Sequence, residues 1–177
     1  MLPRDYSDIN CSVARTLEVL GDRWTLLIIR NALLGVTRFD DHLRLLDLAR
    51  NVLADRLTRL TDDGILERVA YQERPPRHEY RVTDKGRDLW PVIAAMVDWG
   101  DSYYAPGGPP RLLVHRQCGG VLEQHLSCQA CRTTITAADI TTRPGPGASK
   151  TTRPAAQWLD GEVAQSRFAA PQPALAG

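Results

Sequence analysis

Long apolar runs are missing from this chain, although hydrophobic residues make up 43% of its 177 positions. A membrane-spanning helix needs roughly 18 consecutive apolar residues, and the sequence has no such run. The first ten residues, MLPRDYSDIN, are polar and lack the apolar core of a signal peptide. We therefore expect a soluble, cytoplasmic protein without a membrane partner, with one domain or one domain and a small annex.

Lysine is scarce, because nearly all of the 22 cationic residues are Arg, and the net charge is only +1. Residues 1–104 hold 15 Lys and Arg against 17 Asp and Glu, a net charge of −2. The remaining residues hold 7 against 4, a net charge of +3. Overall charge thus does not indicate nucleic acid, and a DNA-binding function would depend on where single Arg residues lie.

Signatures of an active site are also missing. The sequence has no Ser, His and Asp in the order of a known catalytic triad, no pattern that predicts a pocket with paired carboxylates, and no Gly-rich phosphate-binding loop. His42 and His78 fall inside helical and hairpin patterns, so we interpret them as packing or surface residues. We do not expect an enzyme.

Apolar residues recur at helical spacing in four consecutive segments. The second segment is apolar nearly all round, which predicts a buried central helix. The fourth has Leu53, Leu57 and Leu60 on one side and polar residues on the other, which predicts one buried face. The four predicted helices are Ser12–Leu20, Trp24–Leu34, Arg38–Leu46 and Arg50–Thr61.

A β-hairpin is predicted directly after the fourth helix. Gly64 is a natural left-handed residue to end that helix. Apolar and polar residues then alternate from Ile65 to Tyr71 and again before Val82, on either side of the tip Arg74-Pro75-Pro76-Arg77. A helix followed at once by a hairpin is the DNA-reading half of a winged helix. The predicted fold class is α+β, mainly α, with a winged helix-turn-helix.

The fourth helix and the hairpin tip supply candidate DNA contacts. Arg50 and Asn51 begin the helix, and their side chains can pair with guanine and adenine in the major groove. Ala54 allows close approach, and Thr58 can reach a base or a phosphate. Asp47 and Asp55 favour the alternative, that the charges are a solvated surface, because carboxylates repel phosphate. The candidates for phosphate or minor-groove contacts are Arg56, Arg59, Arg74 and Arg77.

A last helix is predicted after an N-cap at Thr83. Its apolar residues, from Leu89 to Trp99, cover more than one face, and Pro91 should kink or divide it. Two interpretations stay open: a core helix folding back on Trp24–Leu34, or a helix whose second face meets a partner.

Three segments are expected after the winged helix of residues 1–104. Residues 105–110, APGGPP, are predicted to be a linker. Residues 111–140 are predicted to form a small β-rich extension with strands RLLVH, GVLEQHL and RTTIT. From Thr141 the chain is rich in Pro, Thr, Gly and Ala without a period. Residues 141–177 are therefore predicted to be a disordered tail, with a transient helix near Ala156–Phe168.

The extension contains two pairs of metal-ligand residues. His115 and Cys118 are three apart, as are Cys128 and Cys131, and such pairs can surround Zn²⁺ tetrahedrally. The extension has few apolar residues, so a bound zinc ion would be needed to stabilise it as a zinc ribbon. Two alternatives remain: a Cys128–Cys131 redox pair, or a metal-free extension with buried thiols. Arg132 stands where such turns often place Gly, and His125 is a competing ligand.

From Cys11 to Trp99 the chain resembles the HxlR-type winged-helix transcriptional regulators of bacteria, in the MarR-like superfamily. It departs from the family at Ser12, where many members have Pro, and by continuing over seventy residues past the last helix. The resemblance rests on Cys11-Ser12-Val13, Gly21–Ile28, Arg38-Phe39, Asn51–Leu57, Asp63–Leu66, Pro75–Tyr80, Thr83–Gly86 and Trp99-Gly100.

The resemblance implies a homodimer that binds double-stranded DNA at a palindromic operator. Ser12–Leu20 and Leu89–Trp99 would pair across the two-fold axis, and two copies of the Arg50–Thr61 helix would read half-sites about 34 Å apart. Arg38 joins the candidate DNA contacts. A small-molecule effector could bind near Trp90, Met96 and Trp99. The rival class is a winged-helix protein-interaction module that does not read DNA.

Cys11 aligns with a cysteine that some relatives use to sense quinones, aldehydes or oxidants. Sensing needs an accessible thiol of low pKa, and Arg15, one turn on, could stabilise a thiolate. The alternative is a small buried apolar residue.

Overall fold

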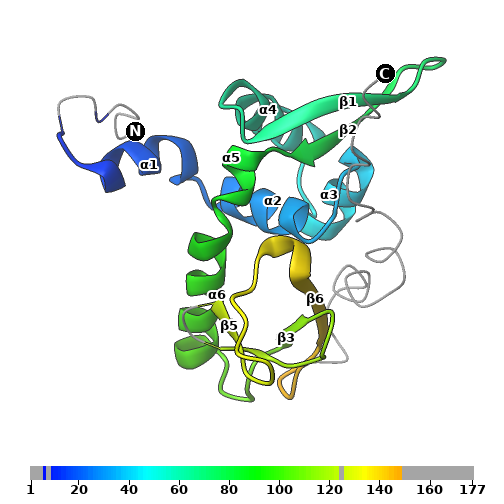
Figure 1. The fold of residues 1–177 in the computed structure, drawn as a ribbon. Coiled ribbons are helices and arrows are strands. Elements are labelled where there is room, and N and C mark those ends of the chain that lie inside the picture. Colours follow the sequence, from blue (N-terminus) through cyan, green and yellow to red (C-terminus); the bar gives the residue numbers. More distant parts are fainter. Residues whose placement is uncertain (1–5, 7–8, 124–125, 149–177) are drawn as a thin grey trace, which may run out of the picture. The chain divides into compact units, whose positions relative to one another are not determined.

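The computed structural model describes residues 6, 9–123 and 126–148 (Figure 1). The chain divides between Ile93 and Ala94 into two compact units. The division falls inside the last helix and not at residues 105–110, where the sequence predicted a linker. Among the described residues, no helix is long and apolar enough to cross a membrane.

Four helices open the first unit, and each lies within one residue of its predicted bounds. The second begins after Asp22, whose carboxylate accepts hydrogen bonds from the backbone N–H groups of Trp24 and Thr25. This N-cap satisfies two donors that a helix start leaves free. The helices are α1 (Ser12–Leu20), α2 (Arg23–Leu33), α3 (Phe39–Leu46) and α4 (Arg50–Asp62).

The core of this unit lies between α2 and α4. Ile28 and Ile29 of α2 are fully buried, which confirms the central helix. Leu53 and Leu57 of α4 are 0% exposed, as the helical spacing predicted. Burying one such side chain contributes about 1.5–3 kcal/mol, so this stripe fixes which face of α4 remains outside.

The hairpin follows α4 as β1 (Leu66–Gln72) and β2 (Arg77–Val82), paired antiparallel (Figure 1). Gly64, with φ of +68°, makes the left-handed turn between helix and strand. A one-residue bridge from Arg38 to Glu79, which the sequence did not predict, adds a short third strand to the hairpin. This arrangement is a winged helix-turn-helix, in agreement with the predicted fold class.

Pro91 divides the last predicted helix. A single turn, α5 (Asp84–Arg87), is capped by the Thr83 hydroxyl, and α6 (Trp90–Tyr104) follows. Pro91 lies in the first turn of α6, where its missing N–H removes no helical hydrogen bond. The division therefore agrees with the prediction.

The described part of the second unit contains two small antiparallel sheets. β3 (Arg111–His115) pairs with β6 (Ile140–Pro144), and β4 (Leu122–Glu123) pairs with β5 (Ser127–Cys128). A 3₁₀ turn, η2 (Ala137–Asp139), precedes β6.

Two predictions for this unit are corrected. The segment RTTIT is not a strand and forms one bridge, from Thr134 to Ser127. The expected disorder from Thr141 was wrong for residues 141–144, because these residues belong to β6 and pair with β3. Residues 149–177 of the expected tail, with the transient helix, lie outside the described residues.

Candidate DNA-reading surface and Cys/His cluster

The outward face of α4 carries the residues that the sequence singled out for base contacts. Arg50, Asn51, Ala54 and Thr58 are all exposed, opposite the buried leucine stripe. Arg50, Ala54 and Thr58 are four residues apart, and Asn51 lies three residues before Ala54, so the four share one side of the helix. The third and fourth helices form the helix-turn-helix, and β1 packs against α4.

Arg50 is held at the start of α4 by its neighbours in α3. Its guanidinium lies 5.1 Å from the centre of the Phe39 ring, and its Nη2 donates to Asp40 at 3.1 Å. Both side chains of this ion pair are mostly exposed, at 69% and 75%. An exposed pair contributes little stability, so Asp40 orients Arg50 without preventing its release to another acceptor.

Arg56 is placed differently. Its side chain is only 14% exposed, and its guanidinium donates to Asp22 at 3.1 Å and 3.0 Å and also to Asp55. Asp22 holds the pKa of the Arg56 guanidinium above its usual range. We therefore infer that Arg56 joins α4 to α2 and does not serve the predicted phosphate contact.

The other cationic candidates lie at the surface. Arg59 is half exposed and pairs with Asp55 at 3.3 Å, one turn back. Arg38 lies 4.8 Å from the centre of the Tyr71 ring, which holds it against β1. Arg74 and Arg77 are exposed on either side of the two prolines at the hairpin tip.

Two helices present apolar residues to solvent. On α1, Val13 and Leu17 are 66% and 49% exposed, while Leu20 is buried. On α6, four residues spaced i, i+4, i+7 and i+11 form one exposed stripe. Trp90 is buried, so it does not share this stripe with Met96 and Trp99. The α6 stripe consists of Val92, Met96, Trp99 and Tyr103.

Cys11 is the exposed N-cap residue of α1, and its side chain makes no capping hydrogen bond. Arg15, which the sequence offered as a partner for its thiolate, forms an ion pair with Glu18 at 2.7 Å. The thiol is accessible, but a sensing function stays a prediction.

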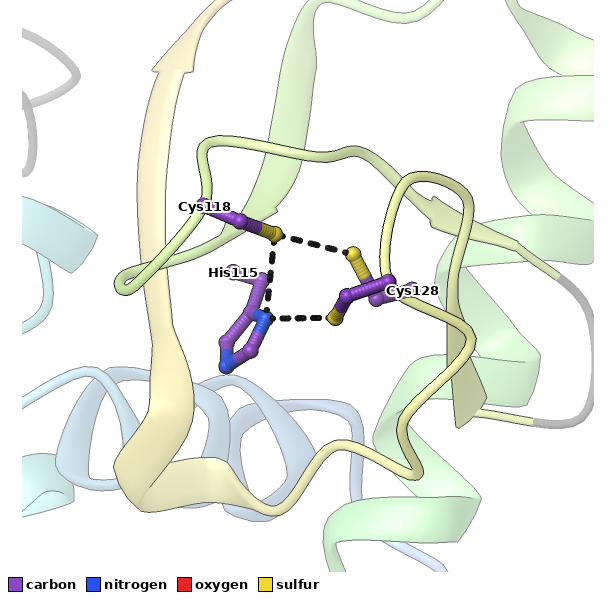
Figure 2. A group of neighbouring side chains, drawn as sticks. His115, Cys118 and Cys128 are labelled. Carbon is purple, nitrogen blue, oxygen red and sulfur yellow. Dashed lines mark hydrogen bonds between the residues drawn. The ribbon is translucent and has the colours of Figure 1, made fainter.

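All four predicted metal ligands meet in the second unit, and Figure 2 shows three of them, His115, Cys118 and Cys128, pointing toward one another. The Nδ1 atom of His115 lies 3.3 Å from the sulfur of Cys118 and 3.3 Å from that of Cys131. The sulfurs of Cys118 and Cys128 are 3.4 Å apart, and all four donor atoms lie within 4.8 Å of one another.

The two ligand pairs lie on similar turns. After Cys118 the chain turns through Gly119, with φ of +69°, and Gly119 donates to the His115 carbonyl at 2.8 Å. After Cys131 it turns through Arg132, with φ of +59°, which donates to the Cys128 carbonyl at 2.8 Å. Arg132 thus adopts the left-handed geometry for which Gly was expected.

Hydrogen bonds in the second turn favour thiolates. The side chain and backbone of Thr133 lower the pKa of Cys131 to about 6. A backbone hydrogen bond from Cys131 lowers the pKa of Cys128. Thiolates are the form of cysteine that binds metals.

The distances fit a tetrahedral metal. Ligands about 2.3 Å (sulfur) and 2.0–2.1 Å (nitrogen) from a tetrahedral zinc ion lie roughly 3.5–3.8 Å from each other, close to the observed 3.3 and 3.4 Å. A set of three sulfurs and one imidazole favours zinc over the oxygen-seeking magnesium and calcium. His125 lies outside the described residues.

The chain has clear similarities to known proteins. Residues 19–107 match the model of the HxlR-like helix-turn-helix family. An uncharacterized HTH-type transcriptional regulator of Mycobacterium tuberculosis is 47% identical over 137 residues, which cover 77% of this chain and 87% of that protein. YdeP of Bacillus subtilis, also an uncharacterized HTH-type transcriptional regulator, is 35% identical over 103 residues, covering 56% and 80%.

The similarity to a solved structure extends beyond the helix-turn-helix. The crystal structure of PA1607, a candidate transcription factor, has a TM-score of 0.63 and 34% identity, covering 84% of this chain and 98% of that one. This coverage is too long to end at residue 107, and the same holds for the 137-residue alignment. Both similarities therefore reach into the segment that contains the Cys/His cluster.

Proposed function

The chain belongs to the HxlR-like helix-turn-helix family, and from this premise we propose that it is a transcriptional regulator that binds a palindromic operator as a homodimer. The observation that carries the proposal is the face of α4, where every residue chosen for base contact is exposed. Arg50 would read guanine and Asn51 adenine, while Thr58 would reach a base or a phosphate.

Contacts to the DNA backbone would come from residues around that helix. Arg59 flanks the reading face, Arg38 lies beside β1, and Arg74 and Arg77 extend from the hairpin tip. Such contacts fix the register of the helix in the groove but do not distinguish bases. Because the winged helix carries no net positive charge, we infer that these few Arg residues supply most of the electrostatic attraction.

A second copy of the chain is the partner that we propose for the exposed apolar residues of α1 and α6. Soluble monomers seldom leave such stripes in water, and α6 exposes Trp99 at 57% and Tyr103 at 73%. A dimer with a two-fold axis would bring two α4 helices to half-sites about one helical turn apart. We assign the α6 stripe to this second copy and not to a small-molecule effector.

The test is binding to DNA from the chain's own promoter region, measured by fluorescence anisotropy at low and moderate salt. The double variant Arg50→Ala/Arg77→Ala should lose specific binding, whereas the wild type should bind with an affinity that falls steeply as salt rises. Arg87→Ala is the matched control, because Arg87 is also exposed but lies on α5, bonded to Asp84. Wild-type protein that does not bind at low salt would overturn the proposal and favour a protein-interaction module.

We further propose that His115, Cys118, Cys128 and Cys131 bind a structural zinc ion. The second unit has a small apolar core, since its fully buried aliphatic side chains include only Ile135 and Ile140 in the described segment. A bound metal adds its binding free energy to the free energy of folding. This contribution explains how a unit with so small an apolar core can be stably folded.

Metal content of the untagged protein, measured by mass spectrometry, tests the zinc proposal. Wild type should contain about one zinc per chain, as a four-ligand structural site predicts. Cys128→Ser should lose it and Cys11→Ser should keep it. Sub-stoichiometric zinc that Cys128→Ser leaves unchanged would contradict the proposal.

A further inference from the structure

We propose that Cys118 and Cys128 form an oxidation site, in which peroxide converts the two thiolates to a disulfide and the zinc ion is released. The inference rests on the proposed zinc site and assigns a chemical response to its ligands. It does not depend on DNA binding.

Exposure distinguishes the two cysteines. Cys118 is exposed, whereas Cys128 is 0% exposed and His115 only 5%. Cys118 is therefore more accessible than Cys128 to a peroxide molecule that arrives from solvent. Accessible thiolates are the ones that peroxides oxidise.

A short distance then makes Cys128 a possible partner for Cys118. The sulfurs of Cys118 and Cys128 are 3.4 Å apart, so a bond of about 2.05 Å requires a relative movement of roughly 1.4 Å. Cys118 lies in the turn that ends with Gly119, outside the paired strands, so it can make this movement. Cys128 is fixed in β5 by its pairing with Leu122.

Cys131 is also exposed, so exposure does not distinguish it from Cys118, and a cysteine bound to zinc is a thiolate in either case. The position of Cys131 distinguishes it from Cys118. It belongs to the same turn as Cys128, and its sulfur lies 3.3 Å from the imidazole of His115. A Cys128–Cys131 disulfide would close a loop of four residues and leave the first turn free. A Cys118–Cys128 disulfide instead links the two turns, as the metal would.

The reaction takes two steps, and its atoms and electrons balance. The Cys118 thiolate attacks one oxygen of hydrogen peroxide, the O–O bond breaks, hydroxide leaves and Cys118 becomes a sulfenic acid. The Cys128 thiolate then attacks the Cys118 sulfur, hydroxide leaves and the S–S bond forms. The cysteine pair loses two electrons and peroxide gains them. With two of its four ligands gone, the site no longer holds zinc.

The experiment treats the full-length, zinc-containing protein with hydrogen peroxide. Released zinc is followed with a colorimetric chelator, and disulfides are located by peptide mass spectrometry after alkylation. We expect release of about one zinc per chain, as a single four-ligand site predicts, together with a Cys118–Cys128 disulfide. Cys11→Ser should behave as wild type. Zinc that stays bound under excess peroxide, or a disulfide between Cys128 and Cys131, would overturn the assignment.

Two histidine substitutions form a matched pair, because two Cys and two His also bind zinc. Cys131→His retains the Cys118–Cys128 pair and should release zinc like the wild type. Cys118→His lacks the oxidised sulfur and should release zinc at least about tenfold more slowly, since imidazole does not form a disulfide. Equal rates in the two variants would contradict the proposal. Protein purified without zinc would overturn the zinc site itself, and disulfide mapping would still decide the pairing.

Discussion

Arg56 binds both carboxylate oxygens of Asp22, with N–O distances of 3.1 Å and 3.0 Å. Asp22 is also the N-cap of α2, where it accepts hydrogen bonds from the backbone of Trp24 and Thr25. Burial raises the pKa of Asp22, but the hydrogen bonds from Arg56 and from the backbone outweigh it and hold the pKa below its ordinary value. One ion pair thus joins the start of the central helix to the proposed recognition helix.

Arg56→Ala is expected to destabilise the fold. Removing the guanidinium leaves Asp22 without its ionic partner, and hydrogen bonds to charged groups contribute about 1.5–3 kcal/mol. Urea denaturation at pH 7 measures the loss. Arg59→Ala is the control, because its exposed pair with Asp55 should be worth less than about 1 kcal/mol. Equal losses of folding free energy in the two variants would show that the Arg56–Asp22 ion pair stabilises the fold no more than the exposed Arg59–Asp55 pair does.

Salt dependence should separate the two kinds of DNA contact. Arg77→Ala should weaken binding to all sequences alike and reduce the slope of log affinity against log salt by about 1, as expected for one lost phosphate contact. Arg50→Ala should cost about 1–3 kcal/mol on the operator and relax the preference at one base pair. Titration of operator and scrambled duplexes at several salt concentrations measures both effects. If Arg77→Ala relaxed the base preference and Arg50→Ala reduced the salt slope, Arg77 would be the base contact and Arg50 the phosphate contact.

Leu17→Glu is expected to convert the proposed dimer to a monomer. Leu17 is 49% exposed on α1, so a charge there costs the single chain little but would be buried unpaired in a dimer. Sedimentation velocity gives the oligomeric state, and circular dichroism checks the fold. Thr16→Glu places the same charge on the next exposed residue, about 100° around the helix from Leu17, and should weaken the dimer less than Leu17→Glu does. A dimer that tolerates Leu17→Glu does not use this face of α1.

The fold of the winged helix could be predicted because its information is local. The spacing of Leu53, Leu57 and Leu60 determines which face of α4 is buried, and hence that Arg50 and Thr58 point outward. The Cys/His cluster was predictable for a similar reason, since ligands three residues apart on tight turns converge wherever the two turns meet.

What the sequence did not reveal depends on contacts between distant segments. Asp22 and Arg56 are 34 residues apart, and only the packing of α2 on α4 brings them together. Ile140–Pro144 has no strand-like alternation, and it becomes a strand because β3 lies beside it. In both cases the partner, and not the segment itself, determines the structure.

His42 should make the stability of the first unit depend on pH. Its ring is 0% exposed, and no hydrogen bond of good geometry satisfies either ring nitrogen within the described residues, although the backbone of Val36 lies close enough to raise the pKa slightly. Burial lowers the pKa of His42 to about 4, from 6.5. The unfolded chain therefore binds a proton at His42 below pH 6.5, whereas the folded chain binds it only below about pH 4. The part of the folding free energy that comes from neutral His42 is complete above pH 6.5 and is lost progressively as the pH falls from 6.5 to about 4.

His42→Leu should remove that dependence. Each pKa unit corresponds to about 1.4 kcal/mol, so the wild type should lose up to roughly 3 kcal/mol between the two pH values. An apolar side chain of similar size leaves no unsatisfied nitrogen, so the variant should be at least as stable as wild type at pH 5. Urea midpoints at several pH values measure the slope, and His78→Gln, on the half-exposed β2 position, should keep it. If His42→Leu retains the wild-type slope, another group that protonates on unfolding is responsible.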